Sequence, residues 1–267
     1  MRTEPLTFSS KTTDFTTQFD NPIQLNKEKS YEAAFFLLET FNTIPNVTNE
    51  NNNFTYSADN GTTWKSIKLK KEAYEIEQIN NEIQRQMIES RDYDVENDSM
   101  HINISIFASL LSAIEINNPS YKINFDVENS IGPLLGFDKQ LLSFGYHISP
   151  NILNITPITS IFINCDIIQG TYVNGRRAKV IHSFSPNVGP GYKIREKPQP
   201  ELVFCSINLT EINSIRIWLT DEENNPIDLQ GQELTIRILI REEPNNKDDI
   251  KDALQELKFE KFFEKFF

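Results

Sequence analysis

Short apolar segments of strand type, separated by turn residues, fill the second half of the chain. Between residues 155 and 242 the runs SIFINCDI, AKVIHSF, ELVFCSINL and ELTIRILI alternate with Asn, Gly and Pro signals such as Asn174-Gly175. A two-residue period puts the apolar side chains on one face of a strand, and closely spaced turns return the chain to the same sheet. Alternation of strands with long helices, typical of parallel sheets, is absent. The pattern predicts an antiparallel β-sandwich or barrel.

The first half of the chain adds further strands. The segment 31–41, YEAAFFLLETF, fits either a helix or a buried strand, and its aromatic content and the Asn-rich turn that follows favour a strand. FTYSA and WKSIKLK flank the turn at 59–61 and predict a hairpin. A second hairpin is predicted to join HINISIF to YKINFDV across the turn at 117–119. The Pro-rich segment 185–200 is too long for a hairpin loop and is expected to cross between sheets.

Residues 73–91 carry the clearest helical pattern of the main domain. Apolar side chains recur mostly three or four positions apart, at Tyr74, Ile76, Ile79, Ile83, Met87 and Ile88. The other side carries Glu, Gln and Asn, which predicts a helix that covers a sheet rather than crossing the core. Since a β-sandwich of this length commonly forms one domain, residues 1–243 are expected to form the main domain. Residues 244–267 are expected to form an amphipathic C-terminal helix.

The tail, residues 244–267, ends in the phenylalanine-rich sequence KFEKFFEKFF. Exposed phenylalanines promote aggregation unless something covers them. The apolar side of the tail either packs back on its own domain or docks on a neighbouring subunit or another protein, and docking is our hypothesis. Truncation after Glu243 is then expected to leave the melting temperature nearly unchanged and to weaken assembly. The candidate docking residues are Ile250, Leu254, Leu257, Phe262, Phe263, Phe266 and Phe267.

The charge of the chain argues against direct contact with nucleic acid. With 26 Lys and Arg against 38 Asp and Glu, the formal net charge is -12, which leaves no basic surface to neutralise phosphates. The pair Arg176-Arg177, at a predicted hairpin tip, is expected to be exposed rather than to bind phosphate. No stretch approaches the roughly 20 apolar residues of a membrane span, and the N-terminus lacks the apolar run of a signal peptide. We expect a soluble protein made inside the cell.

The residues that carry most enzyme chemistry are few and scattered. His101, His147 and His182 lack the spacing of HExxH or CxxC motifs, and neither a phosphate-binding loop nor a GxSxG turn occurs. Cys165 and Cys205 lie in apolar strand segments, where buried reduced thiols are favoured over a disulfide between neighbouring strands. We therefore expect a protein without enzymatic activity, with no catalytic residues, no metal site and no cofactor.

Five segments occur in an order that resembles a known family: YEAAFFLLETFNTIPNV, EAYEIEQINNEI, NSIGPLLGFD, SFSPNVGPGYKI and IRIWLTDEENNPIDLQGQELTIRILI. Together they resemble the penton-type minor capsid proteins of Polinton (Maverick) elements and of adintovirus-like relatives, over residues 6–242. The resemblance implies a single jelly roll that forms a homo-oligomer, expected to be a pentamer. It also implies a place in the virion, at the capsid vertices beside a double-jelly-roll major capsid protein.

A different class of function stays open beside the penton-like structural role. A receptor- or carbohydrate-binding β-sandwich, such as a virion spike, would use the same kind of fold. Mass measurement under native conditions separates the two, since a capsomer is a closed ring. An enzyme, the third alternative, would require a cleft with converging titratable groups.

Overall fold

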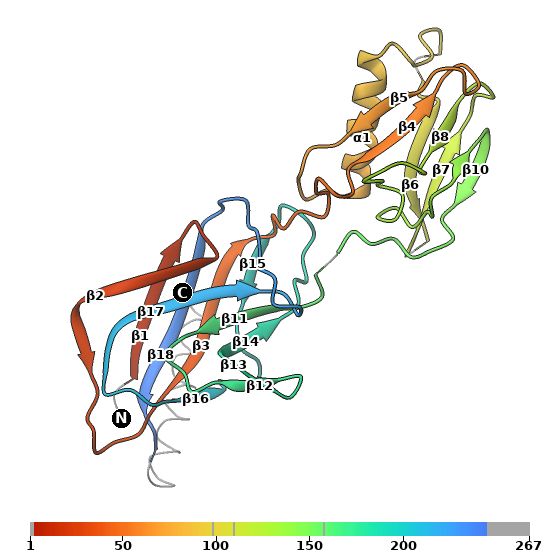
Figure 1. Ribbon diagram of the computed structural model, residues 1–267. Helices are drawn as coiled ribbons and strands as arrows, with labels where there is room; N and C mark the ends of the chain where they lie inside the picture. The colour runs from red at the N-terminus through yellow and green to blue at the C-terminus, as the bar shows by residue number, and fades with distance from the viewer. Residues whose placement is uncertain (1–2, 98, 109, 157, 245–267) are drawn as a thin grey trace. The chain divides into compact units, whose positions relative to one another are not determined.

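Figure 1 shows the computed structural model, which describes residues 3–97, 99–108, 110–156 and 158–244. The chain divides into two compact units. The sandwich unit takes in the chain up to Phe41, Ile158–Asn187 and the chain from Lys193 onward, and the insert unit comprises Asn42–Pro157 and Val188–Tyr192. Residues 42–157 thus form most of a separate compact unit within residues 1–243, for which the sequence predicts one main domain.

Two antiparallel sheets form the sandwich unit (Figure 1). In the first, the β3 sheet, the order is β1 (Thr3–Ser10), β18 (Leu234–Glu242), β3 (Tyr31–Phe41) and β15 (Lys193–Glu196), and β16 (Phe204–Ile207) also pairs with β3. In the second, the β11 sheet, the order is β14 (Val180–Phe184), β11 (Ile161–Cys165), β17 (Glu211–Thr220) and β2 (Asp14–Gln24). A separate hairpin pairs β12 (Thr171–Val173) with β13 (Arg176–Ala178).

The order of these strands is that of a jelly roll. When β15 and β16 are taken as two parts of one strand, the chain order of the main strands is β1, β2, β3, β11, β14, β15/β16, β17 and β18. The β3 sheet then contains the first, eighth, third and sixth strands, and the β11 sheet contains the fifth, fourth, seventh and second. Two sheets with this order make an eight-stranded jelly roll. The predicted antiparallel jelly-roll sandwich is confirmed, whereas the predicted C-terminal helix lies outside the described residues.

β3 is a central strand with both faces covered, which explains its continuous apolar sequence. It lies between β18 on one edge and β15 and β16 on the other. Phe35 points into the sandwich, where its ring stacks on His182 of β14 with 4.3 Å between ring centroids. The expectation of a strand rather than a helix for residues 31–41 is confirmed. Ala33, Ala34, Phe35, Leu37 and Leu38 are each at most 2% exposed although consecutive side chains point to opposite faces, so both faces are covered here and the strand carries an apolar run instead of alternation.

Two sequence expectations about connections in the sandwich unit are confirmed. β14 belongs to the β11 sheet and β15 to the β3 sheet, so the Pro-rich segment 185–200 runs from one sheet to the other. The turn between β12 and β13 holds Asn174 and Gly175 at φ values of 50° and 77°. Asn and Gly adopt positive φ more easily than other residues, and this is what a two-residue hairpin turn requires.

The insert unit combines two small sheets and one helix. The order of one sheet is β5 (Lys65–Lys68), β4 (Asn53–Ser57), β8 (Lys122–Asn124) and β9 (Leu141–Leu142). The order of the other is β10 (Gly145–Ile148), β7 (Leu111–Ile116) and β6 (Ile102–Phe107). The helix α1 (Ile76–Glu89) confirms the helix expected over 73–91, and it buries Ile76, Ile79, Ile83 and Met87 in a core shared with both sheets. This second core is the physical reason why the insert is a unit of its own.

The strand pairing of the insert unit corrects one sequence expectation. The hairpin around residues 59–61 is confirmed as β4 paired with β5. The second predicted hairpin is wrong, because β6 pairs with β7 and β8 pairs with β4. β7 follows β6 after a short connection, so it is the partner that costs the least chain entropy to reach. Within the described ranges, no helix has the length and apolar character that crossing a membrane demands.

Candidate functional site

The histidines of the chain do not come together in a reactive site. His101 and His147 lie in the insert unit, whereas His182 lies in the sandwich unit. His182 Nε2 lies 3.0 Å from Glu196 Oε1, and its ring packs on Phe35, so this histidine is part of the sandwich interior. Among the residues that the structure describes, no group of three or more His, Cys, Asp or Glu side chains could hold a metal ion.

The two cysteines are free thiols buried in the sandwich unit. Burial raises the pKa of Cys165 to about 12 and also raises the pKa of Cys205. A thiol with such a pKa carries almost no thiolate at neutral pH and is a weak nucleophile. The expectation of buried reduced cysteines, rather than a disulfide, is confirmed.

The basic pair Arg176-Arg177 is exposed at the β12–β13 hairpin, as expected. The guanidinium carbon of Arg177 lies 5.9 Å from the centre of the Tyr172 ring across the hairpin. Exposed cation–π contacts of this kind stabilise by about 0.5–1 kcal/mol. The contact therefore accounts for the position of Arg177 without a phosphate ligand.

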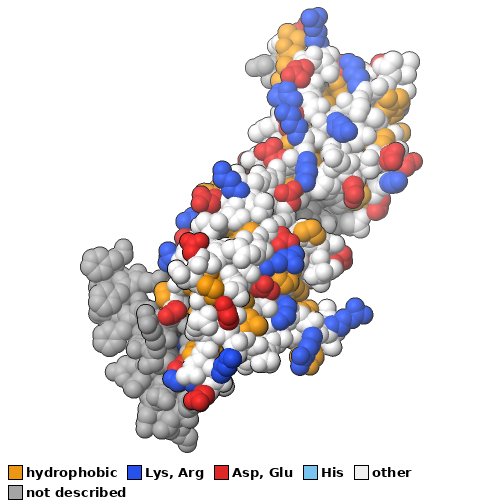
Figure 2. Space-filling view, turned by 60° about the vertical axis from the view of Figure 1, so that its left-hand side comes forward, with side chains coloured by type: hydrophobic (Ala, Val, Ile, Leu, Met, Phe, Trp, Pro, Cys, Tyr) orange, Lys and Arg blue, Asp and Glu red, His pale blue; other side chains and the backbone are white. Residues whose placement is uncertain are grey.

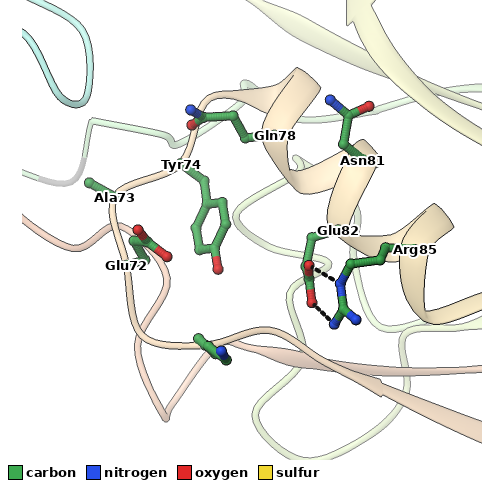
Figure 3. A pocket seen from close by; sticks show the side chains of 8 residues that line it. Glu72, Ala73, Tyr74, Gln78, Asn81, Glu82 and Arg85 are labelled. Carbon is green, nitrogen blue, oxygen red and sulfur yellow. Dashed lines mark hydrogen bonds and ion pairs between the residues drawn. The ribbon is translucent and has the colours of Figure 1, made fainter. Parts of the chain in front are cut away.

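A cavity of 510 Å³ opens beside the start of α1 in the insert unit (Figure 3). In Figure 3, Glu82 and Arg85 point toward each other, and the guanidinium donates two hydrogen bonds of 2.7 Å to the carboxylate. Gln86 Nε2 donates a further hydrogen bond of 2.9 Å to Glu82 Oε1. The cavity, called the groove below, is lined by Lys70, Glu72, Ala73, Tyr74, Gln78, Asn81, Glu82 and Arg85.

These contacts leave Glu82 and Tyr74 unsuited to acid–base catalysis at neutral pH. The hydrogen bonds from Arg85 hold the pKa of Glu82 at about 2, so its carboxylate stays charged and paired. Burial raises the pKa of Tyr74, which is only 8% exposed, so its hydroxyl stays protonated and its ring offers little surface to a ligand. General acid–base catalysis works best with a pKa near the operating pH. The groove is therefore a weak candidate for a catalytic site.

The substitution Glu82→Gln is expected to make the insert unit less sensitive to acid. The pKa of about 2 lies below the ordinary value of 4.5, so the ion pair stabilises the fold above pH 4.5, and this stabilisation is lost as the pH falls to 2. Because Arg85 is half exposed, screening limits the contribution to about 1 kcal/mol. Urea denaturation should show a difference from the wild type at pH 7 that disappears near pH 2. Glu77→Gln, in the same helix, is the control, and an equal difference at both pH values would contradict the assignment.

The outer face of the β10-β7-β6 sheet carries several apolar side chains of the insert unit. Ile104 of β6 and Ile114 of β7 are opposite each other and belong to the core. Since side chains alternate between the two faces of a strand, the neighbouring positions point outward. The Phe107 and Tyr146 rings meet edge to face at 6.4 Å between centroids, which places both on this side. We call this surface the outer insert face; its large apolar members are Phe107, Leu111, Tyr146 and Ile148, and the polar Asn103, Ser105 and Glu115 lie on the same side.

The outer insert face leaves several of its apolar side chains exposed. Tyr146 is 57% exposed and Ile148 is 43% exposed, although neither is charged. Both belong to β10, which is an edge strand of its sheet. Contiguous apolar surface on one protein marks an interaction site, and tyrosine is enriched where binding energy concentrates. Figure 2 shows the more usual surface, with scattered apolar side chains among Lys, Arg, Asp and Glu.

Sequence reasoning did not single out the outer insert face. The signal was present as the alternation of Phe144, Tyr146 and Ile148, which puts three apolar side chains on one face of a short strand. The same alternation would also fit a strand that faces a core, so only the structure separates the two cases. The tail residues named for docking, from Ile250 to Phe267, lie outside the described residues, and their role stays a prediction.

The chain is similar to proteins among the solved structures. No family model and no curated protein matches it. Among solved structures it is similar to the crystal structure of the selenomethionine-labelled mavirus penton protein, with 12% identity, a TM-score of 0.48, and coverage of 91% of this chain and 100% of that chain. The D2-D3 domains of the flagellar cap protein FliD from Escherichia coli give 12% identity and a TM-score of 0.14, with coverage of 88% and 98%. Because both scores are below 0.5, the assignment of the jelly roll rests on the strand order alone.

Proposed function

We propose that this chain is a structural subunit of a virus capsid, a penton-type minor capsid protein that assembles with copies of itself at the vertices of the shell. The observation that carries the proposal is the strand order of the sandwich unit, with first, eighth, third and sixth strands in one sheet and fifth, fourth, seventh and second in the other. Jelly rolls of this kind are the usual building blocks of icosahedral capsids, and they also occur in lectins and cupins.

Fold alone does not give function, so two further observations support the structural role over the alternatives. In the groove beside α1, Glu82 is held in an ion pair and Tyr74 is largely buried, which argues against a catalytic or ligand-binding use. The outer insert face offers exposed apolar side chains of the kind that neighbouring subunits cover. The order of the five sequence segments supports the finer proposal of a relative in Polinton or adintovirus-like elements.

The proposed partners are further copies of this chain, in a ring of five, and a double-jelly-roll major capsid protein. The chain has 38 acidic and 26 basic side chains, and this negative balance argues against a direct contact with the packaged genome. The proposed location is the virion.

Native mass spectrometry of the purified chain, alone and after co-expression with a major capsid protein, tests this proposal. We expect a closed ring of five copies, or incorporation at fivefold positions of shells seen by electron microscopy. A chain that stays monomeric and never joins a shell would rule out the capsid role. A monomer or trimer that binds immobilised glycans would favour the receptor-binding alternative instead.

The double substitution of Tyr146→Asp and Ile148→Asp is expected to weaken assembly at least ten-fold. Carboxylates buried in an apolar interface without partners would cost more than the 1.4 kcal/mol that a ten-fold change requires. Both side chains are exposed in one subunit, so its melting temperature should stay nearly constant. Tyr172→Asp, at an exposed site of the sandwich unit, is the control for added charge. Equal assembly of all three proteins would remove the outer insert face from the interface.

A further inference from the structure

The face of the β3 sheet that points away from the sandwich interior carries a row of apolar side chains. The stack of Phe35 on His182 of the opposite sheet defines the inner side, and Ile238 lies opposite Phe35. The next positions of both strands, Leu239 and Ala34, are paired and therefore point outward. The register continues the row to Pro5 of β1 on one side and to Phe204 of β16 on the other. The outward row thus spans four strands as Pro5, Leu239, Ala34 and Phe204.

The neighbouring positions confirm the direction of these side chains. Arg241, two residues after Leu239, donates a hydrogen bond of 2.5 Å from Nε to Glu32 Oε1. Its guanidinium carbon also lies 3.3 Å from the centre of the Phe204 ring. Arg241, Glu32 and Phe204 can meet only on one face of the sheet, so the outward row and this ion pair share that face.

The middle of the outward row is buried to a degree that the sheet itself does not explain, although Pro5 at its β1 end is exposed. Leu239 is 3% exposed and Leu37, on the same face opposite Arg237, is 2% exposed. Within the row Leu239 lies between Ala34, whose single methyl group is too small to cover a leucine, and Pro5, which is itself exposed. The β11 sheet packs on the other face, through Phe35. An outward leucine at this exposure therefore requires a cover from beyond the two sheets.

We propose that residues 250–267 of the same chain provide this cover, with the apolar side of the tail packed on the outward row. The tail continues directly from β18, the strand that carries Leu239, since the strand ends at Glu242. As a helix, 18 residues would extend about 27 Å, which is more than the roughly 14 Å across which four neighbouring strands extend. The apolar positions from Ile250 to Phe267 supply the side chains that such packing needs. This assigns the tail to its own sheet, in place of the partner docking that the sequence favoured.

A photo-cross-linking residue tests the position of the tail. With p-benzoylphenylalanine in place of Phe263, irradiation of the full-length protein should give a product of single-chain mass. Digestion and mass spectrometry should then join the tail to the segments around Ala34 or Leu239. If the same segments are cross-linked in a product with the mass of two chains, a neighbouring copy supplies the tail. Cross-links to other surfaces, or none, would likewise overturn the proposal.

A matched pair of substitutions tests whether the outward row holds the tail. Leu239→Asp should release the tail, so that trypsin cleaves after Lys258 or Lys261 at least ten times faster than in the wild type. Thr7→Asp, on the same face but exposed, should leave the cleavage rate nearly unchanged. If Leu239→Asp fails to fold, the tail variant with Phe262→Asp and Phe266→Asp gives the same test without changing the sandwich. Slow cleavage in that tail variant would overturn the proposal.

Truncation after Glu243 gives an independent measurement. The shortened chain should bind the apolar dye anilinonaphthalene sulfonate with several-fold stronger fluorescence and melt several degrees lower than the full chain. This differs from the nearly unchanged melting temperature expected from the sequence. An unchanged melting temperature without dye binding would leave the outward row covered by something other than the tail, and the proposal would fail.

Discussion

Phe35→Ala is expected to lower the free energy of unfolding of the sandwich unit by about 3–5 kcal/mol. The ring of Phe35 is 2% exposed and stacks on His182 between the two sheets. Its removal takes away apolar contact and leaves a cavity that strands fixed by hydrogen bonds cannot close. The same substitution should also loosen the His182–Glu196 contact, because the ring of Phe35 supports the histidine.

The two tryptophans allow this loss to be measured in one unit at a time. Trp218 lies in β17 of the sandwich unit and Trp64 in the insert unit. In a Trp64→Phe background, urea denaturation followed by fluorescence reports on the sandwich alone. Phe41→Ala removes the same number of atoms from the exposed end of the same strand and should cost less than about 1 kcal/mol. Equal losses in both variants would mean that Phe35 is not part of a packed core.

Gly136→Ala is expected to destabilise the insert unit by about 2–5 kcal/mol, from steric overlap and backbone strain together. A methyl group at this position would lie 2.3 Å from the backbone oxygen of Asn151, which itself accepts a hydrogen bond from the Ser149 hydroxyl. Gly136 also has a φ of 80°, where side chains are disfavoured. Because the obstacle is backbone, a change of rotamer cannot remove it.

A second glycine separates the two causes. Gly191, also in the insert unit, has the same φ of 80°, but a methyl group there would meet nothing within 4 Å. Gly191→Ala should therefore cost only the backbone strain, about 1–2 kcal/mol. In a Trp218→Phe background, Trp64 reports the unfolding of the insert unit in urea. Similar losses at the two glycines would show that the loop around Gly136 moves to accept the methyl group.

The sequence was informative wherever a local pattern decides the local structure. Alternation in β17 and β18 and the Asn174-Gly175 turn predicted antiparallel strands, because strand faces and tight turns depend on residues within a few positions of each other. The spacing of Ile76, Ile79, Ile83 and Met87 predicted α1 for the same reason. The sequence contains no clustered metal-binding or nucleophile motif, and it therefore favours a surface over a group of reactive side chains as the functional site.

The candidate site depended on features that no local pattern contains. Tyr146 and Ile148 alternate like core residues, and only the tertiary structure shows that they point away from the core that contains Ile114. Leu239 and Ala34 lie in continuous apolar segments, and the sequence of such a segment does not show which residues point to which face of the sheet. Which side faces the β11 sheet, and which side forms the outward row, follows from the register of four strands.

The sequence by itself therefore determined the class of fold, and the tertiary structure decided its division and its surfaces. Strands and turns depend on interactions between residues a few positions apart, so their pattern can be predicted from the sequence. The insert unit depends on a core assembled from segments between Val47 and Leu142, and the jelly roll on pairing β1 with β18 across almost the whole chain. Such contacts depend on which distant segments meet, and many pairings satisfy the same alternation of apolar and polar residues.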